Sequence, residues 1–240
     1  MMHEGLTDYL EIMQLTGVSE LKKASENRIV FKERKTPAPA PEYQLNEVAT
    51  TDDSKAGKLR QLAEEVAMCT KCRDLAESRT QTVFGVGNPD SPLLFLGEAP
   101  GREEDQQGEP FVGRAGQLLN DIITKGMKLN REDVYICNIL RCRPPGNRNP
   151  MPDEAGHCRP FLDRTLEIIK PRFICCLGAI AAKNLLASEQ TIGAMRGKVL
   201  DYNGIKVVCT YHPAYLLRNP AAKKDTWNDI QLLMQEMEMK

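Results

Sequence analysis

The sequence has no excess of charge of either sign and few aromatic residues. Its 240 residues carry 32 basic and 33 acidic side chains, a net charge of −1, and aromatic residues make up 5%. A protein that binds nucleic acid through overall positive charge is therefore not indicated, and any basic surface must be local. No apolar run approaches the length of a membrane span, and no signal-peptide pattern opens the chain. We therefore expect a cytoplasmic protein that does not engage a membrane.

Three motifs that would explain the glycine-rich stretch Gly97–Gly116 are also missing. The sequence contains no phosphate-binding G-x-x-x-x-G-K-[ST] and no dinucleotide-binding G-x-G-x-x-G. No serine stands in a nucleophile elbow. Two interpretations of the charges in this stretch remain open. They form either a catalytic carboxylate pair, Glu98 with Glu104 or Asp105, or a solvated turn.

What the chain does contain is a regular alternation of apolar runs and helical patterns. Near-continuous apolar runs rich in β-forming residues are typical of parallel strands that are covered on both faces. The predicted strands are residues 93–97, 134–140, 173–178 and 206–211, and the predicted helices are residues 58–69, 115–126, 153–169, 179–187 and 222–239. The alternation predicts a three-layer α/β/α sandwich around a central, mostly parallel four-stranded sheet.

Residues 1–57 differ in composition from the rest and are predicted to form an N-terminal extension. Residues 5–24 have the apolar spacing of one or two short amphipathic helices. Residues 33–57 are polar and rich in proline and alanine, as in a flexible linker. We expect this extension either to dock on the main domain, residues 58–240, or to bind a partner.

Polar or glycine-rich residues follow three of the predicted strands. Gly97–Gly101 lies at the end of the first, Asn138 near the end of the second, and His212 after the fourth. Ligands of open α/β sheets bind at the carboxyl ends of the strands. These residues are therefore expected to meet at one edge of the sheet.

The eight cysteines fall into two groups of four. Those inside apolar runs are interpreted as small buried hydrophobic residues: Cys137, Cys175, Cys176 and Cys209. Those near turns and polar residues are Cys69, Cys72, Cys142 and Cys158. One close pair and two distant cysteines can bind zinc or an iron–sulfur cluster, and their spacing alone does not choose between the two.

Four blocks of sequence, with these loop cysteines interleaved, resemble one known family. The blocks are "GEAPGREED", "PFVGRAGQLL", "NILRCRPPGNRNP" and "HPAYLLR". In this order they resemble the iron–sulfur uracil-DNA glycosylases called family 4, over residues 62–238 but not over residues 1–57. The resemblance implies a monofunctional enzyme that flips uracil out of DNA and hydrolyses its N-glycosidic bond, which initiates base excision repair.

The resemblance also implies roles for individual residues. The four loop cysteines match the ligands of a [4Fe–4S] cluster. Phe111 matches the aromatic ring that stacks on uracil, Asn138 the amide that reads the base edge, and His212 the histidine that faces the leaving base. The remaining matches are Glu98 and Ala99 in the pocket loop, and Glu104 and Asn147 as polar residues linked to catalysis and water placement. Because Ala99 stands where many other uracil glycosylases carry an aspartate, catalysis should depend more on His212.

The segment "HPAYLLRNP" is expected to place Tyr215, Leu216, Leu217 and Arg218 beside the DNA. Leu216 or Leu217 is either the wedge that fills the space left by the flipped base or a core residue at the start of a helix. Candidate phosphate contacts are Arg141, Arg143, Arg148, Arg196 and Lys198. The expected partner is uracil-containing DNA. We expect a monomer that engages no membrane, with residues 1–57 as a candidate site for a repair or replication partner.

Other classes of function stay open from the sequence. One is a non-catalytic DNA-binding or polymerase-associated iron–sulfur module on the same fold, and another is a zinc-containing nucleotide hydrolase. The combination of Phe111, Asn138 and His212 argues against the binding module, because binding alone does not need all three. A related iron–sulfur group reacts covalently through a histidine in a basic insert. The segment "GNRNPMPDE" contains no histidine and no basic run, which disfavours that mechanism.

Overall fold

The structure, a computed structural model, describes residues 52–239. The predicted helices at residues 5–24 and most of the predicted linker lie outside the described residues. Helix α2 (Lys55–Ala67) begins inside the predicted linker, because the Ser54 hydroxyl accepts the Gly57 N–H at 3.0 Å and caps the helix. The proposed domain boundary at residue 57 stays a prediction. No helix within residues 52–239 combines the length and apolar character that crossing a membrane requires.

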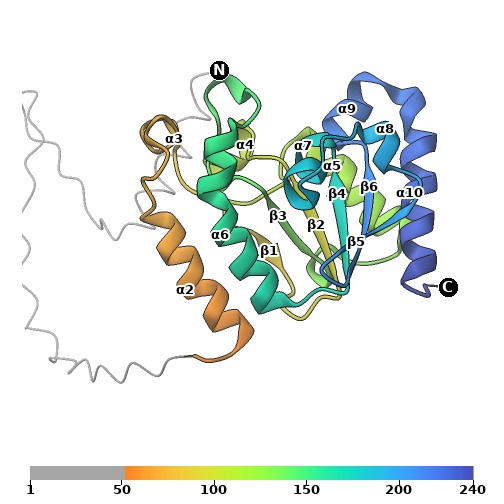
Figure 1. Ribbon diagram of the computed structural model, residues 1–240, viewed down its shortest axis with the longest axis horizontal. Helices are drawn as coiled ribbons and strands as arrows, with labels where there is room; N and C mark the ends of the chain where they lie inside the picture. The colour runs from red at the N-terminus through yellow and green to blue at the C-terminus, as the bar shows by residue number, and fades with distance from the viewer. Residues whose placement is uncertain (1–51, 240) are drawn as a thin grey trace, which may run out of the picture. The chain divides into compact units, whose positions relative to one another are not determined.

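A six-stranded sheet in the order β1-β3-β2-β4-β6-β5 forms the centre of the fold (Figure 1). The strands are β1 (Val86–Gly87), β2 (Leu93–Gly97), β3 (Tyr135–Asn138), β4 (Phe173–Leu177), β5 (Val199–Tyr202) and β6 (Ile205–Thr210). The four inner strands are parallel to one another, and each edge strand is antiparallel to its neighbour. The inner four are the strands that the sequence predicts.

The prediction of only four strands was wrong, because both edge strands were missed. β1 is two residues long and carries no apolar run. β5 has no fully buried residue, in contrast to the inner strands. It pairs with β6 across Asn203 and Gly204, whose φ angles of 51° and 84° suit a type I′ hairpin turn. The Asn-Gly pair was the signal in the sequence that identifies this hairpin.

Helices cover both faces of the sheet. The α-helices after α2 are α3 (Arg73–Ser78), α4 (Arg102–Gln107), α5 (Arg114–Asp121), α6 (Pro152–Ile169), α7 (Ala179–Leu186), α8 (Ile192–Met195), α9 (Pro213–Arg218) and α10 (Lys223–Glu236). Short π or 3-10 turns are η1 (Ile122–Gly126), η2 (Arg131–Asp133), η3 (Pro145–Asn147) and η4 (Pro220–Ala222). Helix α4 replaces the solvated turn that was one interpretation of "REEDQQ".

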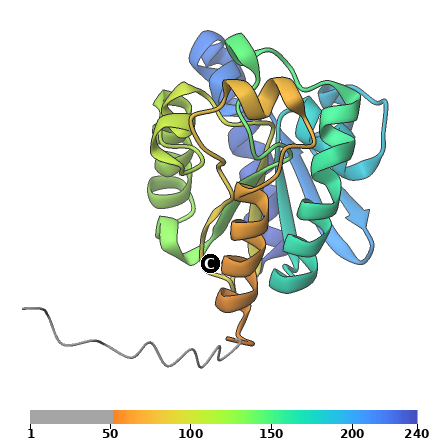
Figure 2. The same cartoon turned by 90° about the vertical axis from the view of Figure 1, so that its left-hand side faces the viewer.

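Alternate side chains of the inner strands face opposite helical layers, as the two-residue period of a strand requires. Leu94 and Leu96 of β2 pack in a core with residues of α2, α6 and α7. Leu93 and Phe95 of the same strand pack in a second core with residues of α5, η1 and α10. Figure 2 shows α5 and α6 on opposite sides of the sheet. The three-layer α/β/α arrangement is therefore confirmed.

Two glycine substitutions test the hairpin turn. Gly204→Ala should lower the free energy of unfolding by about 1 kcal/mol, because an L side chain is strained at a positive φ. No heavy atom would contact the new Cβ, so the effect isolates backbone strain. Chemical denaturation measures the change.

Gly156→Ala is the matched control, since Gly156 lies inside α6 and its Cβ would also meet nothing within 4 Å. This variant should instead stabilise the protein by about 0.5–1 kcal/mol, because alanine loses less entropy in a helix. Equal effects of the two substitutions would contradict the left-handed turn.

Candidate active site

A hollow of about 490 Å³ lies at the carboxyl ends of β2, β3 and β6. It gathers most of the residues that the sequence singled out for chemistry: Glu98, Ala99, Glu104, Phe111, Asn138, Asn147 and His212. Tyr215, Leu217, Arg218 and Arg148 line it as well. The predicted convergence at one edge of the sheet is therefore confirmed.

Asn138 forms one wall of this hollow and leaves a buried acceptor free. It is the last residue of β3, pairs in register with Gly97 of β2, and is 2% exposed. Its Oδ1 has no hydrogen-bond partner among the described residues. Because an unpaired buried acceptor costs about 1–3 kcal/mol, its presence points to a ligand that donates to it.

Gly97 keeps the space between Asn138 and Phe111 open. A Cβ at Gly97 would approach Asn138 Oδ1 and would stand 2.6 and 2.7 Å from the Cζ and Cε2 atoms of the Phe111 ring. Any side chain at this position would therefore displace the ring or fill the space beside the amide. The site needs glycine here for close approach and not for an unusual φ.

The backbone at Phe111 has an unusual conformation, which the side chain of Glu104 stabilises. Phe111 is buried and has a φ of 55°, in the left-handed region that non-glycine residues rarely adopt. The Glu104 carboxylate oxygen Oε1 accepts the N–H groups of Val112 and Gly113, each at 3.1 Å. Such a strained residue persists only where its surroundings fix it, and strain of this kind is concentrated at functional sites.

Asp105, next to Glu104 on α4, anchors the helix on its other side. Its two carboxylate oxygens accept the N–H and hydroxyl of Thr80 at 2.9 and 2.7 Å. Glu104 and Asp105 therefore act on two different segments, and the interpretation of Asp105 as half of a catalytic pair with Glu98 loses support. Burial raises the pKa of the Glu98 carboxyl.

His212 is held as a neutral ring that donates through one nitrogen. It is the N-cap of α9, and its Nδ1 accepts the N–H of Ala214 at 3.1 Å. The neutral ring therefore carries its proton on Nε2. Burial, together with the charge of Arg218, lowers its pKa to about 4. The ring centroid lies 5.6 Å from that of Phe111.

The four loop cysteines also come together, outside the hollow, from the segment before α3, the loop after β3 and helix α6. Cys142 and Cys158 are buried in one cluster with Leu75 and Leu140, and Cys72 packs against it. Burial raises the pKa of Cys72 to about 12, with further increases from Cys158, Cys142 and Cys69. Four thiols this close cannot all ionise without a positively charged group between them. The donor set therefore fits a metal centre.

Both a zinc ion and an iron–sulfur cluster take four thiolates, so the donor set alone does not choose between them. Within residues 52–239, no group of three or more His, Cys, Asp or Glu side chains is close enough to hold one metal ion.

Arg79 joins the two halves of this cysteine group. Its guanidinium donates to the Cys69 carbonyl at 2.9 Å and to the Ala67 carbonyl at 3.1 Å. It also contacts Cys142 Sγ at 3.1 Å. The same arginine therefore holds the Cys-x2-Cys segment against the loop that carries Cys142.

Several of the residues expected to touch DNA are buried inside the protein instead. Leu216 is 1% exposed and belongs to the interior, whereas Leu217 is 38% exposed, so the wedge candidate is Leu217. Arg141 is 1% exposed and donates to the Phe84 carbonyl, which excludes a phosphate contact. Leu216 and Leu217 differ because successive side chains of a helix are rotated by about 100° around its axis.

The other basic candidates differ in how many hydrogen bonds they already form within the protein. Arg196 donates from Nε to Asp229 at 3.0 Å and to the Asp225 carbonyl at 2.6 Å, which favours a role inside the fold. Arg143 donates to Asn147 at 2.8 Å, and Arg148 forms a two-pronged pair with a buried glutamate. Arg218 and Lys198 are exposed and remain available for phosphate contact.

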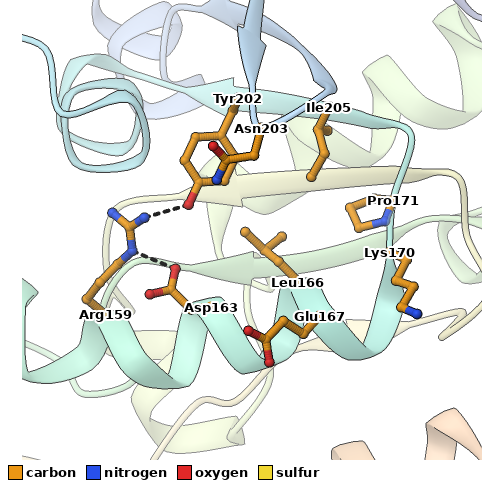
Figure 3. Close-up of a pocket in the computed structure, with 9 residues that line it drawn as sticks. All are labelled: Arg159, Asp163, Leu166, Glu167, Lys170, Pro171, Tyr202, Asn203 and Ile205. Carbon is orange, nitrogen blue, oxygen red and sulfur yellow. Dashed lines mark hydrogen bonds and ion pairs between the residues drawn. The ribbon is translucent and has the colours of Figure 1, made fainter.

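A second hollow, of about 550 Å³, lies between α6 and the β5–β6 hairpin (Figure 3). Arg159 occupies one end, where it donates to Asp163 at 2.6 Å and to the Tyr202 hydroxyl at 2.5 Å. None of the residues that the sequence singled out lines this hollow. It holds no unpaired buried group among the described residues, unlike the hollow around Asn138.

Comparison with known proteins identifies relatives over most of the chain. The family model described as the uracil DNA glycosylase superfamily matches residues 84–231, a segment that contains Phe111, Asn138 and His212 but not Cys69 or Cys72. Three curated relatives, each named type-4 uracil-DNA glycosylase, come from Archaeoglobus fulgidus, Thermotoga maritima and Saccharolobus solfataricus.

The three relatives share 44%, 47% and 41% identical residues with this chain, in the same order. The alignments cover 72%, 66% and 75% of this chain. They cover 90%, 82% and 86% of the relatives. The likeness therefore extends over nearly the whole of each relative.

The protonation of His212 can be measured directly. By NMR, the His212 ring should titrate with a pKa of about 4, well below the ordinary value of about 6.5. The unfolded chain takes up this proton at a higher pH than the folded chain does. The free energy of unfolding should therefore be greatest above about pH 6.5 and fall as pH drops toward 4.

The variant His212→Asn identifies which NMR resonance belongs to His212, and it also serves as the control. Asparagine can still cap α9 but does not titrate. The variant should lack the resonance and should lose less stability than the wild type between pH 6.5 and 4. A His212 titration near pH 6.5 in the folded wild type would contradict the lowered pKa.

Proposed function

The chain belongs to the uracil-DNA glycosylase superfamily, and we propose that Asn138, Phe111 and His212 carry out its chemistry. It is an enzyme that excises uracil from DNA by hydrolysing the N-glycosidic bond. The product of this reaction is an abasic site, which makes the reaction the first step of base excision repair. The observation that carries the assignment of residues is the unpaired Oδ1 of buried Asn138 beside the Phe111 ring.

The Asn138 amide matches one base edge. Uracil presents N3–H as a donor and O4 as an acceptor, and a carboxamide offers an acceptor and a donor at the same spacing. Cytosine has an acceptor at N3 and a donor at N4, so it would face the amide with like groups. We propose that the fixed amide accepts uracil and rejects cytosine, because each buried polar group left unpaired costs about 1–3 kcal/mol.

Phe111 provides the flat apolar surface that the extruded base needs. A base inside duplex DNA cannot be reached by an active site, so the nucleotide must be flipped out and lose its stacking neighbours. The left-handed backbone at Phe111, held by Glu104, sets the ring beside Gly97 before any substrate arrives. A preorganised ring of this kind replaces the lost stacking with little further ordering.

His212 stabilises the leaving group. When the N-glycosidic bond breaks, uracil leaves as an anion with charge on N1 and O2, and a donor aimed at O2 stabilises that charge as it develops. The neutral ring offers Nε2–H and needs no proton transfer to do so. Its low pKa keeps it neutral at physiological pH. Backbone N–H groups of Glu98 and Ala99 are candidates for assisting it.

The attacking water must reach C1′ from the face of the sugar opposite to the departing uracil. Glu104 and Asn147 line the same hollow and are the candidates for holding this water. Oε1 of Glu104 is engaged with the Phe111 loop, whereas Oε2 accepts no hydrogen bond from the described residues. The developing oxocarbenium-like sugar carries positive charge, which a nearby carboxylate favours.

We propose that Cys69, Cys72, Cys142 and Cys158 hold a [4Fe–4S] cluster. Cys142 and Cys158 are buried in one cluster with Cys72 packed against it, and the resemblance to the iron–sulfur glycosylases of family 4 favours a cluster over a single zinc ion. When bound, the cluster would cross-link the segment before α3, the loop after β3 and α6. The loop after β3 carries Arg148, which lines the hollow.

The alternative of a non-catalytic DNA-binding module on the same fold is not favoured. Binding alone would not require a buried acceptor without a partner, a strained aromatic residue and a neutral donor histidine in one hollow. All of these features cost stability. Their combination is accounted for by the chemistry of base excision.

Single-turnover excision tests the three assigned roles. On oligonucleotides with one uracil, His212→Ala should lower the rate about 100- to 1000-fold. Asn138→Ala should lower it about 5- to 150-fold, the equivalent of one group left unpaired at about 1–3 kcal/mol. Matched oligonucleotides with thymine, cytosine or hypoxanthine at the same position report specificity.

Asn203→Gly is the matched control for the asparagine variant. Asn203 lies in the β5–β6 turn at a positive φ that glycine adopts readily, and it does not line the hollow around Asn138. This variant should excise uracil at the wild-type rate. A wild-type protein that is folded yet leaves uracil in place would overturn the proposed roles.

The metal centre is tested by removing one ligand. Purified wild type should contain about four iron atoms per chain and show broad visible absorption. Cys142→Ala should lose both and unfold at a lower denaturant concentration, because the cross-link is gone. Cys176→Ala is the matched control, since Cys176 is buried in β4 and should keep its iron. A colourless, zinc-containing wild type would contradict the cluster.

A further inference from the structure

One exposed aromatic residue on the rim of the hollow is not used by the chemistry proposed above. Tyr215 lies on α9, three residues after His212, and its side chain is 40% exposed. It lines the same hollow as Asn138 and His212. An exposed aromatic ring next to a binding hollow suggests contact with a ligand.

The ring of Tyr215 is held from below by a second tyrosine. The rings of Tyr211 and Tyr215 are stacked, with centroids 5.0 Å apart and planes inclined by 28°. The Arg196 guanidinium lies over the Tyr211 ring at 5.2 Å. Arg196, Tyr211 and Tyr215 thus form a stack, which we call the rim stack.

The base of the rim stack is fixed by a buried carboxylate. Asp229 of α10 is 0% exposed and accepts Arg196 Nε at 3.0 Å. It also accepts the Thr210 hydroxyl at 2.8 Å and the Gly197 N–H at 3.0 Å. Arg196 donates in addition to the Asp225 carbonyl. The lower part of the rim stack is therefore preorganised, which lowers the entropy cost of binding to Tyr215.

The position of Tyr215 matches the path of a strand that enters the hollow. A uracil in contact with Asn138 and His212 is covalently joined to its neighbours, so the next nucleotide must lie at the rim. That neighbour has lost one stacking partner, because the uracil beside it has been extruded. Stacking of such a base on an aromatic side chain is sequence-tolerant, since every base has a π-face.

We propose that Tyr215 is a stacking subsite for the nucleobase adjacent to the uracil in the same strand. The subsite rests on the proposed function and deepens it by assigning the contact that receives the flanking base. It also explains Arg196, which supports the platform and does not contact phosphate. Leu217, two residues further on the same helix, fills the gap left by the uracil and is a separate element.

The test is a coupling cycle between protein and DNA. Single-stranded oligonucleotides carry one uracil with either a normal base or a tetrahydrofuran spacer at the 5′ or the 3′ neighbour. Wild type should lose about 5- to 150-fold in kcat/KM when the base on one side is missing, as expected for one stacked base. Tyr215→Ala should lose a similar factor on the intact oligonucleotide and nothing more on the spacer.

Two variants sharpen the cycle. Tyr215→Phe keeps a flat ring and should retain the spacer penalty of the wild type. Trp227→Ala removes an aromatic side chain of similar exposure, 38%, that does not line the hollow, and it should also retain that penalty. If Tyr215→Ala unfolds, Tyr215→Leu keeps the apolar volume without the ring and takes its place.

The outcomes separate the subsite from the function on which it rests. If wild type excises uracil but Tyr215→Ala loses as much kcat/KM as wild type does when the spacer replaces the 5′ or the 3′ neighbour, the subsite is wrong and the proposed function stands. If wild type does not excise uracil, the proposed function fails. Fluorescence anisotropy with the same oligonucleotides then measures the same cycle in binding, and absence of coupling there overturns the subsite as well.

Discussion

The parallel pairing of β2 with β3 is the constraint on which the site depends. Its register sets Gly97 directly beside Asn138, where the missing side chain of one leaves room at the amide of the other. A shift by one residue would turn Asn138 to the opposite face of the sheet. The register is secured by burial on both faces, because alternate residues of β2 belong to two separate cores. Recognition is thus specified by the same packing that specifies the fold.

Helix α4 connects the two ends of the site. Its consecutive carboxylates bind in different directions, Glu104 to the loop of Phe111 and Asp105 to Thr80. Thr80 follows Arg79, which holds the segment of Cys69 against Cys142. A continuous series of short polar contacts therefore runs from the cysteine group to the stacking ring. This arrangement gives the loop cysteines a mechanical relation to the hollow although they lie outside it.

Much of this architecture could be predicted from local sequence signals. The inner strands are dense apolar runs, and Asn138 and His212 directly follow or end such runs, so their meeting follows from parallel topology. Residues whose role depends on a distant partner could not be assigned in that way. Arg196 is held inside the fold by a hydrogen bond to Asp229, which lies 33 positions away in the sequence. The choice between Leu216 and Leu217 depends on the rotation of a six-residue helix, which spacing does not determine.

The edge strands and α4 were missed for a different reason. β1 has two residues, and β5 is half exposed, so neither has the composition of a buried strand. The charges of α4 are read as solvent-facing in sequence, yet two of its acids are buried because the backbone groups they accept are supplied by other loops. Side chains that satisfy the backbone elsewhere are not visible in local periodicity.

The hydrogen bond from the Ala214 N–H to His212 Nδ1 has two effects. Nδ1 accepts from the backbone at the start of α9, and by doing so it fixes the proton on Nε2. A second proton would turn Nδ1 from an acceptor into a donor, and the helix that bears Tyr215 and Leu217 would lose its cap. Losing an N-cap costs a helix about 0.5–2 kcal/mol, so protonation of His212 would weaken the start of α9 as it charges the ring. One proton therefore affects both the hydrogen-bond donor of the site and the helix that carries Tyr215 and Leu217.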